Sequence, residues 1–413
     1  MRRDDGPASR TIEHVVVVGG GVAAQRAVFA LRDLGYERAI TLLSREAVAP
    51  YDRTLLSKSM IRERSEDPVL LRPATSYAEH GIDLRLRAEA RALDTLRCEV
   101  VCADGRRVPY DRLVLATGAA AVLPRVFDVP GVHTLRELAD LAPLLAALEP
   151  ARRLVIVGAG FIGGELASSA RALGLDVAVV EGAPAPLALT LGEAVGGRVA
   201  DLQRANGVEL HVGVPVSSIA GRRGDWRVAL ADGRELAADV VVLARGMRPR
   251  IDWLHGSGLR LDGGVQTDLH CRTNLPGVFA AGDCARWRSL RYGVPMHAGH
   301  WDVAAKHGEA AAANALGEPV VFDPVPFFWS DQHGRKLAMA GATVRWDEAQ
   351  IEEGEEPGAF TATYRTSDGE RVALFSTRDV RSVARAHREL AALETRPDTL
   401  ISRAATTPHA THP

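Results

Sequence analysis

The sequence predicts an α/β protein with two Rossmann-like dinucleotide-binding domains and a C-terminal α+β domain. Three observations lead to this fold class. A β-branched run, Val15–Val18, precedes a glycine loop and a helical segment. The stretch "LVIVGAGFIGGELASSARALGLDVAVVE", residues 154–181, repeats the order of strand, glycine loop, helix and strand. From residue 321 the chain becomes rich in aromatic residues and Pro, and later segments alternate like antiparallel strands.

The composition is that of a globular protein with several domains. The chain has 413 residues, 46% hydrophobic and 25% charged, with a formal net charge of -2. Two or three domains are expected at this length. Nothing in the charge balance indicates nucleic acid or a membrane surface. Four cysteines are few for a secreted disulfide scaffold, and the N-terminus has no apolar signal core, so we expect a cytoplasmic protein.

The first unit begins with the strand 15–18. A helix is expected over 22–34, ended by Gly35, and a second strand over 39–43. Residues 51–76 are polar and irregular. Strands are then expected over 82–96, 97–101 and 112–116.

The second unit begins at Arg153, and a helix is expected over 191–205. A hairpin follows over 226–236, and apolar strands are expected over 239–243 and 277–285, before a helix over 301–316. We predict four segments, with the limits 11–122, 123–246, 247–320 and 321–400. Residues 1–10 and 401–413 are expected to be flexible tails.

The two glycine loops predict two dinucleotide sites. The first has Gly19, Gly21 and Ala24 in the pattern G-x-G-x-x-A, and the second has Gly158, Gly160 and Gly163 in the pattern G-x-G-x-x-G. The first Gly makes a tight turn, the second lets the backbone approach a pyrophosphate, and the third position lets the helix pack on the strand. A flavin between a nicotinamide and another carrier explains two sites most economically.

The residue at the end of the second strand in each unit is expected to contact an adenosine ribose. Glu181 holds that position in the second unit, and no basic residue follows in "EGAPAPLALT", which favours NADH over NADPH. In the first unit the strand ends at Ser44, with Glu46 just beyond, and either residue could make the contact.

With these segments in place, the chain resembles the FAD-containing, NADH-dependent ferredoxin reductases, the group with putidaredoxin, rubredoxin and biphenyl-dioxygenase ferredoxin reductases. The resemblance covers nearly the whole chain and includes "VVVVGGGVAAQRA", "LVIVGAGFIGGELA", "GVFAAGDCA" and "PFFWSDQHGRKLAMAG". It implies a glutathione-reductase-like flavoprotein fold with FAD and NADH as cofactors. In this fold, 11–122 and 247–320 are the two parts of an FAD-binding domain, 123–246 is an inserted NADH-binding domain and 321–400 is a C-terminal interface domain. The residues expected to bind cofactor are Gly19, Gly21, Val22, Ala23, Ala24, Ser44, Glu46, Arg53, Lys58, Thr117, Gly118, Gly158, Gly160, Phe161, Ile162, Gly163, Glu181, Gly246, Gly282, Asp283, Trp301 and Trp329.

The resemblance also implies a catalytic pair, Lys58 and Glu165. Lys58 is expected beside the central flavin nitrogen, with Glu165 approaching it where nicotinamide docks. An ammonium there can stabilise negative charge that develops on the flavin, and a carboxylate compensates the buried cation. Asp283 is expected to hydrogen-bond the ribityl chain. The chain departs from the usual pattern at Ala49, and at Arg245 and Arg250, where the family has small and amide residues.

The positions of the cysteines and histidines argue against a redox-active disulfide and against a metal site. No cysteine occurs before Cys98, so the paired cysteines of disulfide reductases are missing from the stretch 53–58. Cys98 and Cys102 are interpreted as inert. His297, His300 and His307 are interpreted as pocket or surface residues, and no metal site is expected.

These features predict a reductase that passes electrons from NADH through FAD to a 2Fe-2S ferredoxin, which supplies a haem monooxygenase or a ring-hydroxylating dioxygenase. The alternatives are an NADH-dependent flavin reductase for rubredoxin or a quinone, and a non-catalytic FAD-binding protein. Ferredoxins are usually acidic, so the basic segment "CARWRSLRYG" is the expected docking site, as an exposed loop carrying Arg286, Arg288 and Arg291.

Overall fold

The computed structural model describes residues 11–297 and 299–393. The predicted tails, 1–10 and 401–413, lie outside the described residues, as does the end of the predicted C-terminal domain from residue 394. Within the described ranges, no helix combines the length and the apolar character that crossing a lipid bilayer requires.

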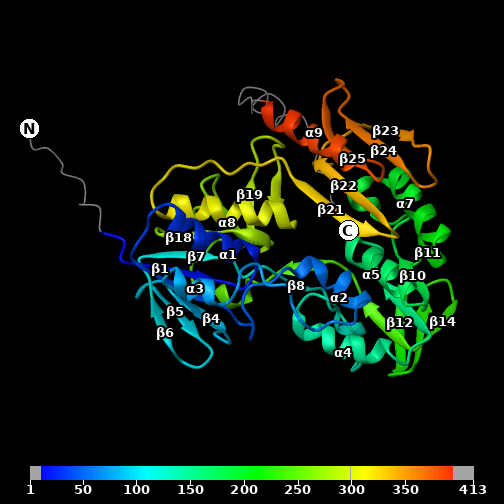
Figure 1. Cartoon of the computed structure of the whole chain (residues 1–413), viewed down its shortest axis with the longest axis horizontal. Coiled ribbons are helices and arrows are strands. Elements are labelled where there is room, and N and C mark those ends of the chain that lie inside the picture. The colour runs from blue at the N-terminus through cyan, green and yellow to red at the C-terminus, as the bar shows by residue number, and fades with distance from the viewer. Residues whose placement is uncertain (1–10, 298, 394–413) are drawn as a thin grey trace, which may run out of the picture.

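The first dinucleotide unit is built on a five-stranded parallel sheet with the order β18-β7-β1-β2-β3. Its strands are β1 (His14–Val18), β2 (Ala39–Leu43), β3 (Ile82–Arg85), β7 (Arg112–Leu115) and β18 (Val278–Ala280). Helices α1 (Val22–Asp33) and α8 (Trp301–Ala315) pack together beside this sheet (Figure 1). Val15 and Val17 are fully buried in the core beneath these helices, as their β-branched run predicted.

The second unit has a four-stranded parallel sheet with the order β11-β10-β9-β15. Its strands are β9 (Arg153–Val157), β10 (Asp176–Glu181), β11 (Val208–Val212) and β15 (Val240–Leu243). The helices of this part are α4 (Leu138–Leu148), α5 (Phe161–Ala172), α6 (Ala188–Leu191) and α7 (Glu193–Ala205). The single helix predicted over 191–205 is therefore wrong at its start, because Gly192, with φ +78°, separates α6 from α7.

Each unit also carries a small antiparallel sheet. One contains β4 (Ala90–Asp94), β5 (Glu99–Cys102) and β6 (Arg107–Pro109), and the other β12 (Val216–Arg222), β13 (Asp225–Leu230) and β14 (Glu235–Ala238). The strands predicted over 82–96 and 97–101 are wrong in their limits. Arg87 and Cys98 have positive φ values, 53° and 54°, so the chain turns at both positions and shorter strands result.

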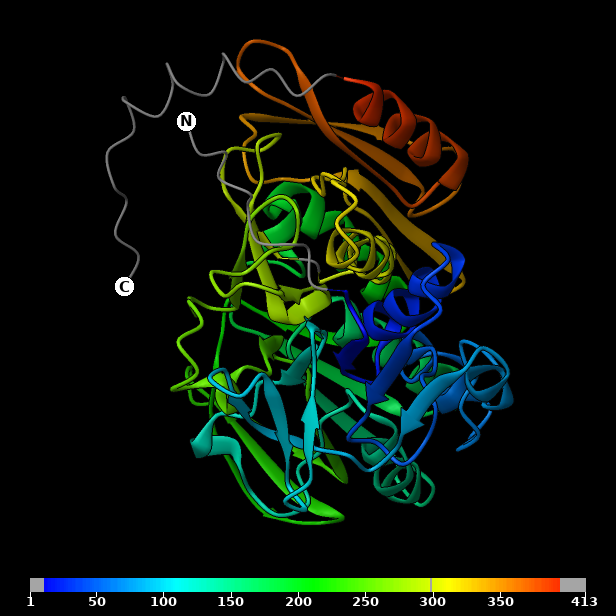
Figure 2. The ribbon, with the colours of Figure 1, turned by 90° about the vertical axis from the view of Figure 1, so that its left-hand side faces the viewer.

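The C-terminal part is an antiparallel sheet with the order β21-β22-β25-β24-β23, as the alternating segments predicted. Its elements are β21 (Phe327–Gln332), β22 (Arg335–Gly341), β23 (Glu348–Glu353), β24 (Phe360–Arg365), β25 (Arg371–Ser376) and α9 (Val380–Ala392). Helix α9 packs on β22 and β25, and this part forms one end of the molecule (Figures 1 and 2). Apolar residues of α7 share a core with the sheet, so the C-terminal part is anchored on the second unit.

Shorter elements link these parts. They are α2 (Ser59–Arg62), α3 (Thr75–Glu79), β8 (Ala119–Ala121), β16 (Met247–Pro249), β17 (Val265–Thr267), β19 (Ala285–Arg288), β20 (Pro295–His297) and the 3₁₀ turns Arg53–Leu55, Arg125–Phe127, Asp252–Leu254 and Gly282–Cys284. β8 pairs antiparallel with β16, where Ala121 faces Met247. The chain thus leaves the first unit and returns to it at one place.

Candidate functional site

A cavity of about 830 Å³ lies where the three parts of the molecule meet. Most of the predicted site residues line it, namely Gly19, Gly21, Val22, Ala23, Ser44, Glu46, Arg53, Lys58, Thr117, Gly118, Gly160, Phe161, Ile162, Glu165, Gly246, Gly282, Asp283, Trp301 and Trp329. Four others are not among the lining residues: Ala24, Gly158, Gly163 and Glu181. The two glycine loops therefore open onto one shared space, although more than 130 residues separate them in the chain.

The first glycine loop has a different role at each position. Gly19 has φ +146°, and a Cβ there would clash with the carbonyl oxygen of Ala116. A Cβ on Gly21 would meet nothing within 4 Å, because that position faces the cavity. Ala24 is fully buried in the core beneath the loop. The loop thus leaves space beside Gly21 for a ligand at the start of α1, where free N–H groups favour an anion.

The second loop repeats this arrangement at the start of α5. A Cβ on Gly158 would clash with the Ala244 carbonyl oxygen, and one on Gly163 with the Gly158 carbonyl oxygen. A Cβ on Gly160 would again meet nothing within 4 Å, and this residue lines the cavity. Gly158 and Gly163 are therefore needed for the turn and the helix packing, while Gly160 leaves room for a ligand.

The residues that follow β2 and the residue that ends β10 have different surroundings. Ser44 is fully buried, and its Oγ has no hydrogen-bond partner. Glu46 accepts a hydrogen bond of 2.7 Å from the Tyr51 hydroxyl and pairs with Arg53. Glu181 instead accepts hydrogen bonds from the backbone N–H groups of Ala159 (2.8 Å) and Ala183 (2.9 Å). Its carboxylate fixes the second glycine loop from behind.

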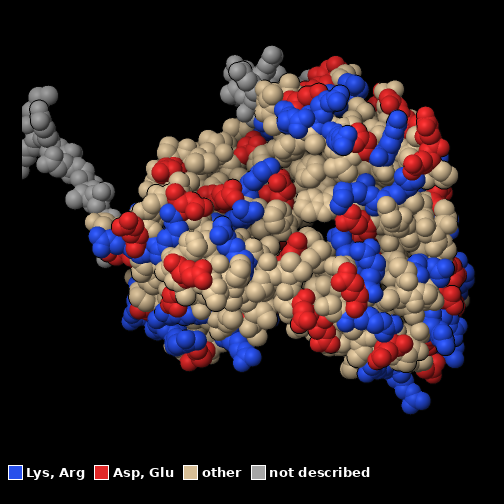
Figure 3. All heavy atoms as spheres, viewed as in Figure 1, with Lys and Arg blue, Asp and Glu red and all other residues tan. Residues whose placement is uncertain are grey.

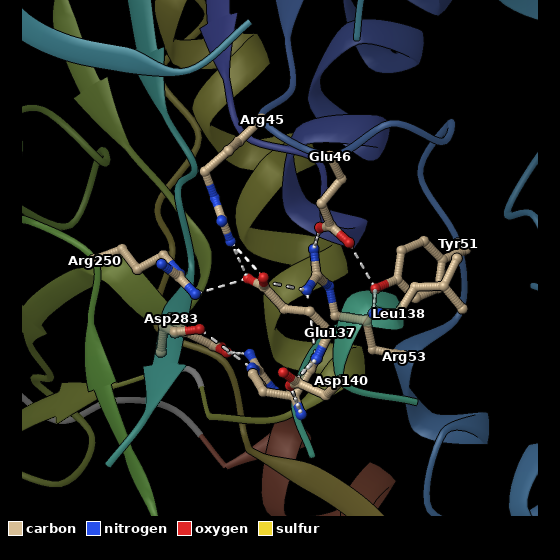
Figure 4. A network of polar contacts seen from close by, with 11 residues as sticks. Arg45, Glu46, Tyr51, Arg53, Glu137, Leu138, Asp140, Arg250 and Asp283 are labelled. Carbon is tan, nitrogen blue, oxygen red and sulfur yellow. Dashed lines mark hydrogen bonds and ion pairs between the residues drawn. The ribbon is translucent and has the colours of Figure 1, made fainter. Parts of the chain in front are cut away.

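A network of arginines surrounds Glu137, the residue that precedes α4 (Figure 4). The Glu137 carboxylate pairs with Arg45 and with Arg250, whose Nη2 lies 2.7 Å from Oε1, and Arg53 is 3.9 Å away. Burial opposes the charged form of Glu137, but the arginines outweigh it and lower the pKa of its carboxyl. The arginines come from segments far apart in the chain, so the network ties the start of α4 to the first unit.

Asp283 has a partner that the sequence did not reveal. Arg136 Nη2 donates to Asp283 Oδ2 at 2.7 Å, and both side chains line the cavity (Figure 4). The backbone N–H of Arg136 and of Glu137 donate to Asp140 Oδ2, which completes a capping box at the start of α4. The acidic residues in "RELAD" were a local signal for this cap, but not for the contact with Asp283.

Lys58 and Glu165 form a buried ion pair in the cavity wall. Lys58 Nζ lies 2.8 Å from Glu165 Oε1 and donates to the Thr54 carbonyl oxygen at 2.9 Å. Glu165 Oε2 accepts from the Ser57 hydroxyl at 2.5 Å. The two residues are only 7% and 5% exposed, so each charge depends on these partners. The structure thus brings together the pair that the sequence predicted, 107 residues apart.

Aromatic residues form another part of the wall. The rings of Trp301 and Trp329 are 6.3 Å apart, and His300 stacks on Phe328 at 4.5 Å. Burial lowers the pKa of His300 to about 4, so its ring is neutral at physiological pH. Trp301 Nε1 is buried without a hydrogen-bond partner. This free donor, the unpaired Ser44 Oγ and the two open glycine positions fit a long ligand with both aromatic and polar groups, such as FAD.

The other histidines and cysteines that the sequence singled out pack in the core or lie at the surface. His307 is fully buried, stacks on Phe322 at 3.9 Å and accepts a hydrogen bond from the Gly282 N–H, and burial lowers its pKa to about 3. His297 is exposed on β20. Burial raises the pKa of the Cys102 thiol. In the part of the chain that the structure describes, no cluster of His, Cys, Asp or Glu has a metal-binding arrangement.

The prediction of an exposed loop at 284–293 is wrong. Residues 285–288 form β19, so Trp287 points into the core, where it is 2% exposed, and Arg286 and Arg288 point the other way. Arg286 pairs with Asp262 at 2.8 Å, and Arg291 donates to the carbonyl oxygen of Leu390 at 2.9 Å. The strand alternation explains Trp287 as core packing, and it leaves Arg288 as the exposed arginine of this segment.

Comparison with known proteins places this arrangement in a family. Residues 13–308 match the pyridine nucleotide-disulphide oxidoreductase family, and residues 327–406 match a reductase C-terminal domain. The chain belongs to the pyridine nucleotide-disulphide oxidoreductase family. This confirms the predicted fold class and the resemblance to ferredoxin reductases.

Individual relatives cover most of the chain. The ferredoxin–NAD(+) reductase component of the biphenyl dioxygenase system from Paraburkholderia xenovorans is 34% identical over 87% of this chain and 88% of its own length. Rubredoxin-NAD(+) reductase from Pseudomonas putida is 32% identical over 82% and 89%. The crystal structure of a covalent putidaredoxin reductase–putidaredoxin complex has a TM-score of 0.87 and 28% identity, covering 95% and 96%.

Proposed function

We propose that this protein is an FAD-dependent NADH:ferredoxin oxidoreductase. The observation that carries the proposal is the buried Lys58–Glu165 pair in the wall of a cavity onto which both glycine loops open. Relatives at 32–35% identity are ferredoxin reductase components of dioxygenase systems. The ferredoxin is proposed to supply an oxygenase, either a haem monooxygenase or a ring-hydroxylating dioxygenase, in the cytoplasm.

The residues of the first unit are proposed to hold FAD. Gly21 and the start of α1 suit its diphosphate, and Ser44 Oγ and Trp301 Nε1 offer unused polar atoms. The Arg136–Asp283 pair lines the same space. When bound, FAD accepts two electrons from NADH as a hydride and passes electrons on one at a time, which a 2Fe-2S ferredoxin requires.

The residues of the second unit are proposed to bind NADH and direct it to the flavin. Gly160 and the start of α5 suit the NADH diphosphate. Lys58 supplies a fixed positive charge where negative charge develops during hydride transfer, and Glu165 holds that ammonium in place. The low exposure of both side chains excludes water, which strengthens their electrostatic effect.

Anaerobic stopped-flow bleaching of the flavin by NADH tests this proposal. Lys58→Met should slow bleaching by about tenfold to a hundredfold with FAD still bound, because it removes one charged donor from the reacting site. Lys306→Met is the control, since Lys306 pairs with Asp302 on α8 outside the cavity. A purified protein that binds no FAD, or equal rates for wild type and Lys58→Met, would contradict the proposal.

We propose that the acidic ferredoxin docks at the face that carries Arg286, Arg288 and Arg291. Arg288, the exposed member, is the main candidate. Charges of both signs are interspersed on the side of the molecule drawn in Figure 3, and the formal net charge is -2, so attraction must be local. Arg288→Glu should slow ferredoxin reduction at low salt and leave ferricyanide reduction unchanged. Arg227→Glu is the matched control, because Arg227 is an exposed arginine on β13, far from this segment in the chain. Equal ferredoxin rates for both variants would exclude this face.

A second acceptor class is favoured by one comparison. The similarity to a rubredoxin reductase extends over 82% of this chain. Turnover with purified ferredoxin, rubredoxin and a soluble quinone, compared at equal concentration, separates these acceptors. If the protein prefers rubredoxin or the quinone, the proposed acceptor changes from ferredoxin to that molecule. The proposed roles of NADH and FAD stay the same.

A further inference from the structure

A buried chain of hydrogen bonds leads from the C-terminal sheet to the Glu165 carboxylate. Ser330 Oγ donates to Glu165 Oε1 at 2.7 Å, and Gln332 Nε2 lies 3.1 Å from Ser330 Oγ. Gln203 Nε2 donates to Gln332 Oε1 at 2.7 Å. Ser330, Gln332 and Gln203 are each at most 3% exposed, so the chain is shielded from water.

All four links of this chain can point in one direction. Gln203 Oε1 lies 2.8 Å from His333 Nε2, and the histidine nitrogen is the donor because an amide oxygen only accepts. Each following group then donates toward Glu165, which as a carboxylate only accepts. Aligned hydrogen bonds polarise one another, and they end here on a buried negative charge.

Helix α5 has a glycine where it passes this chain of hydrogen bonds. A Cβ on Gly164 would lie 2.5 Å from Gln332 Oε1, so a side chain at the position before Glu165 would displace the amide. The adjacent Gly163 is required by the glycine loop itself, whereas Gly164 is required by the C-terminal sheet. The backbone N–H of His333 also donates to Ser168 Oγ at 2.7 Å. This contact holds the turn after β21 against α5.

We propose that Ser330, Gln332 and Gln203 are positioning residues for Glu165, through which the C-terminal sheet sets the Lys58–Glu165 pair for hydride transfer. The inference rests on the proposed function. Neither glycine-loop unit supplies the hydroxyl on Glu165 Oε1, which comes from β21. The sheet, expected from the sequence as an interface domain, is thereby assigned a part in the reacting site.

The other charged groups near Glu165 do not replace the Ser330 contact. The Asp331 backbone N–H lies 3.3 Å from Glu165 Oε1, but the Asp331 carboxylate pairs with Lys336. His333 has its pKa lowered to about 4 by burial and by the charge of Arg171, so it is neutral at physiological pH. The Ser330 hydroxyl is thus the neutral donor through which the sheet makes its shorter contact with Glu165 Oε1.

Single-turnover flavin bleaching by NADH separates positioning from binding. Ser330→Ala should lower the limiting rate by about tenfold, because it removes a hydrogen bond to a charged group, and leave the NADH dissociation constant unchanged. Ser330→Thr, which keeps the hydroxyl, should restore most of the rate. Gln332→Met, one link further away and outside the cavity lining, should lower the rate by about threefold.

A double variant tests whether Ser330 acts through Glu165. In a Glu165→Gln background, Ser330→Ala should cause no further loss, whereas an independent structural role would give additive losses. Thr361→Val on β24 is the matched control, because it removes a hydroxyl from the same sheet without contact to Glu165. Crystal structures give a readout without turnover: in Ser330→Ala the Lys58–Glu165 distance should exceed the 2.8 Å of the native chain.

The outcomes of the two proposals are distinguishable. A wild-type protein that NADH does not reduce contradicts the proposed function. A wild-type protein that is reduced rapidly, with unchanged limiting rates in both Ser330→Ala and Gln332→Met, overturns only the positioning role. Additive losses in the Glu165→Gln background would also overturn it.

Discussion

The two glycine-loop units share one backbone design, but their acidic residues are used in different ways. In the first unit Glu46 lies in the cavity wall and joins Tyr51 and Arg53. In the second unit Glu181 does not line the cavity, and its carboxylate accepts hydrogen bonds from two backbone N–H groups. The first unit is thus enclosed by a charged network from several segments, whereas the second is held by its own backbone. In line with the proposed function, we expect FAD to stay bound in the first unit and NADH to exchange in the second.

The largest effects should follow from filling the two open glycine positions. Gly21→Val should weaken FAD binding by about ten- to a hundredfold, because the new side chain enters the cavity without displacing protein atoms. Gly160→Val should leave FAD bound and weaken NADH binding by a similar factor. Fluorescence titration of FAD-free protein and NADH saturation of bleaching measure the two constants. Loss of FAD from Gly160→Val would show that the two units are assigned in the wrong order.

Asp283→Ala should have the next largest effect and should be confined to the first unit. It removes a partly buried carboxylate and leaves the Arg136 guanidinium without its partner. We expect FAD binding to weaken by about 1–3 kcal/mol, with NADH saturation unchanged. Asp262→Ala is the control, because it removes an exposed carboxylate whose arginine partner lies outside the cavity. FAD binding equal to wild type would exclude Asp283 as a cofactor contact.

Glu181→Arg should affect only the second unit. The substitution replaces a carboxylate that repels a 2′-phosphate by a group that attracts it, so the preference for NADH over NADPH should fall by about tenfold. Glu181→Gln separates charge from geometry, since its amide oxygen can still accept from the Ala159 N–H. Steady-state rates with both coenzymes give the ratio. A wild-type preference for NADPH would contradict the role given to Glu181.

The smallest effect concerns pH and the histidines packed against the first unit. Burial lowers the pKa of His300 to about 4, from 6.5 in an unfolded chain. Between these values the unfolded chain binds more protons, so the free energy of unfolding falls as pH drops below 6.5. His300→Gln should reduce this pH dependence by about 1–2 kcal/mol between about pH 7 and about pH 5. Equal slopes of Tm against pH in both proteins would contradict a neutral, buried His300.

Local features of the site could be predicted from the sequence, and contacts between distant segments could not. The glycine loops were correct because turn geometry and helix packing depend on neighbouring residues, as at Gly19 and Gly158. The ion pairs of Glu137 were missed because they join segments without any shared sequence pattern. Ser330 lies within a quoted motif, yet its partner Glu165 is 165 residues away.

The strands of the parallel sheets were predicted correctly, because they depend on local sequence patterns. The positions at which strands end were predicted less well. Buried β-branched runs mark the parallel strands, since both faces of those strands are covered. The positive φ values at Arg87 and Cys98 have no such signal, because neither residue type favours that conformation. The exposed loop predicted around Arg288 failed because basic and aromatic residues in alternation also describe a strand with one buried face.

The pairing of β8 with β16 makes the segment between them a self-contained insert. Its first and last residues are adjacent, with Ala121 opposite Met247. A segment whose ends meet adds little loop-closure entropy to the host chain, and this is the usual condition for inserting one domain into another. Under the proposed function, we therefore expect that coenzyme specificity can be exchanged with this segment as a cassette joined at these two strands. The sheet of the first unit would keep its own connections. The cassette must retain Glu165, Gly164 and Gln203, because the C-terminal sheet contacts them directly or through one another.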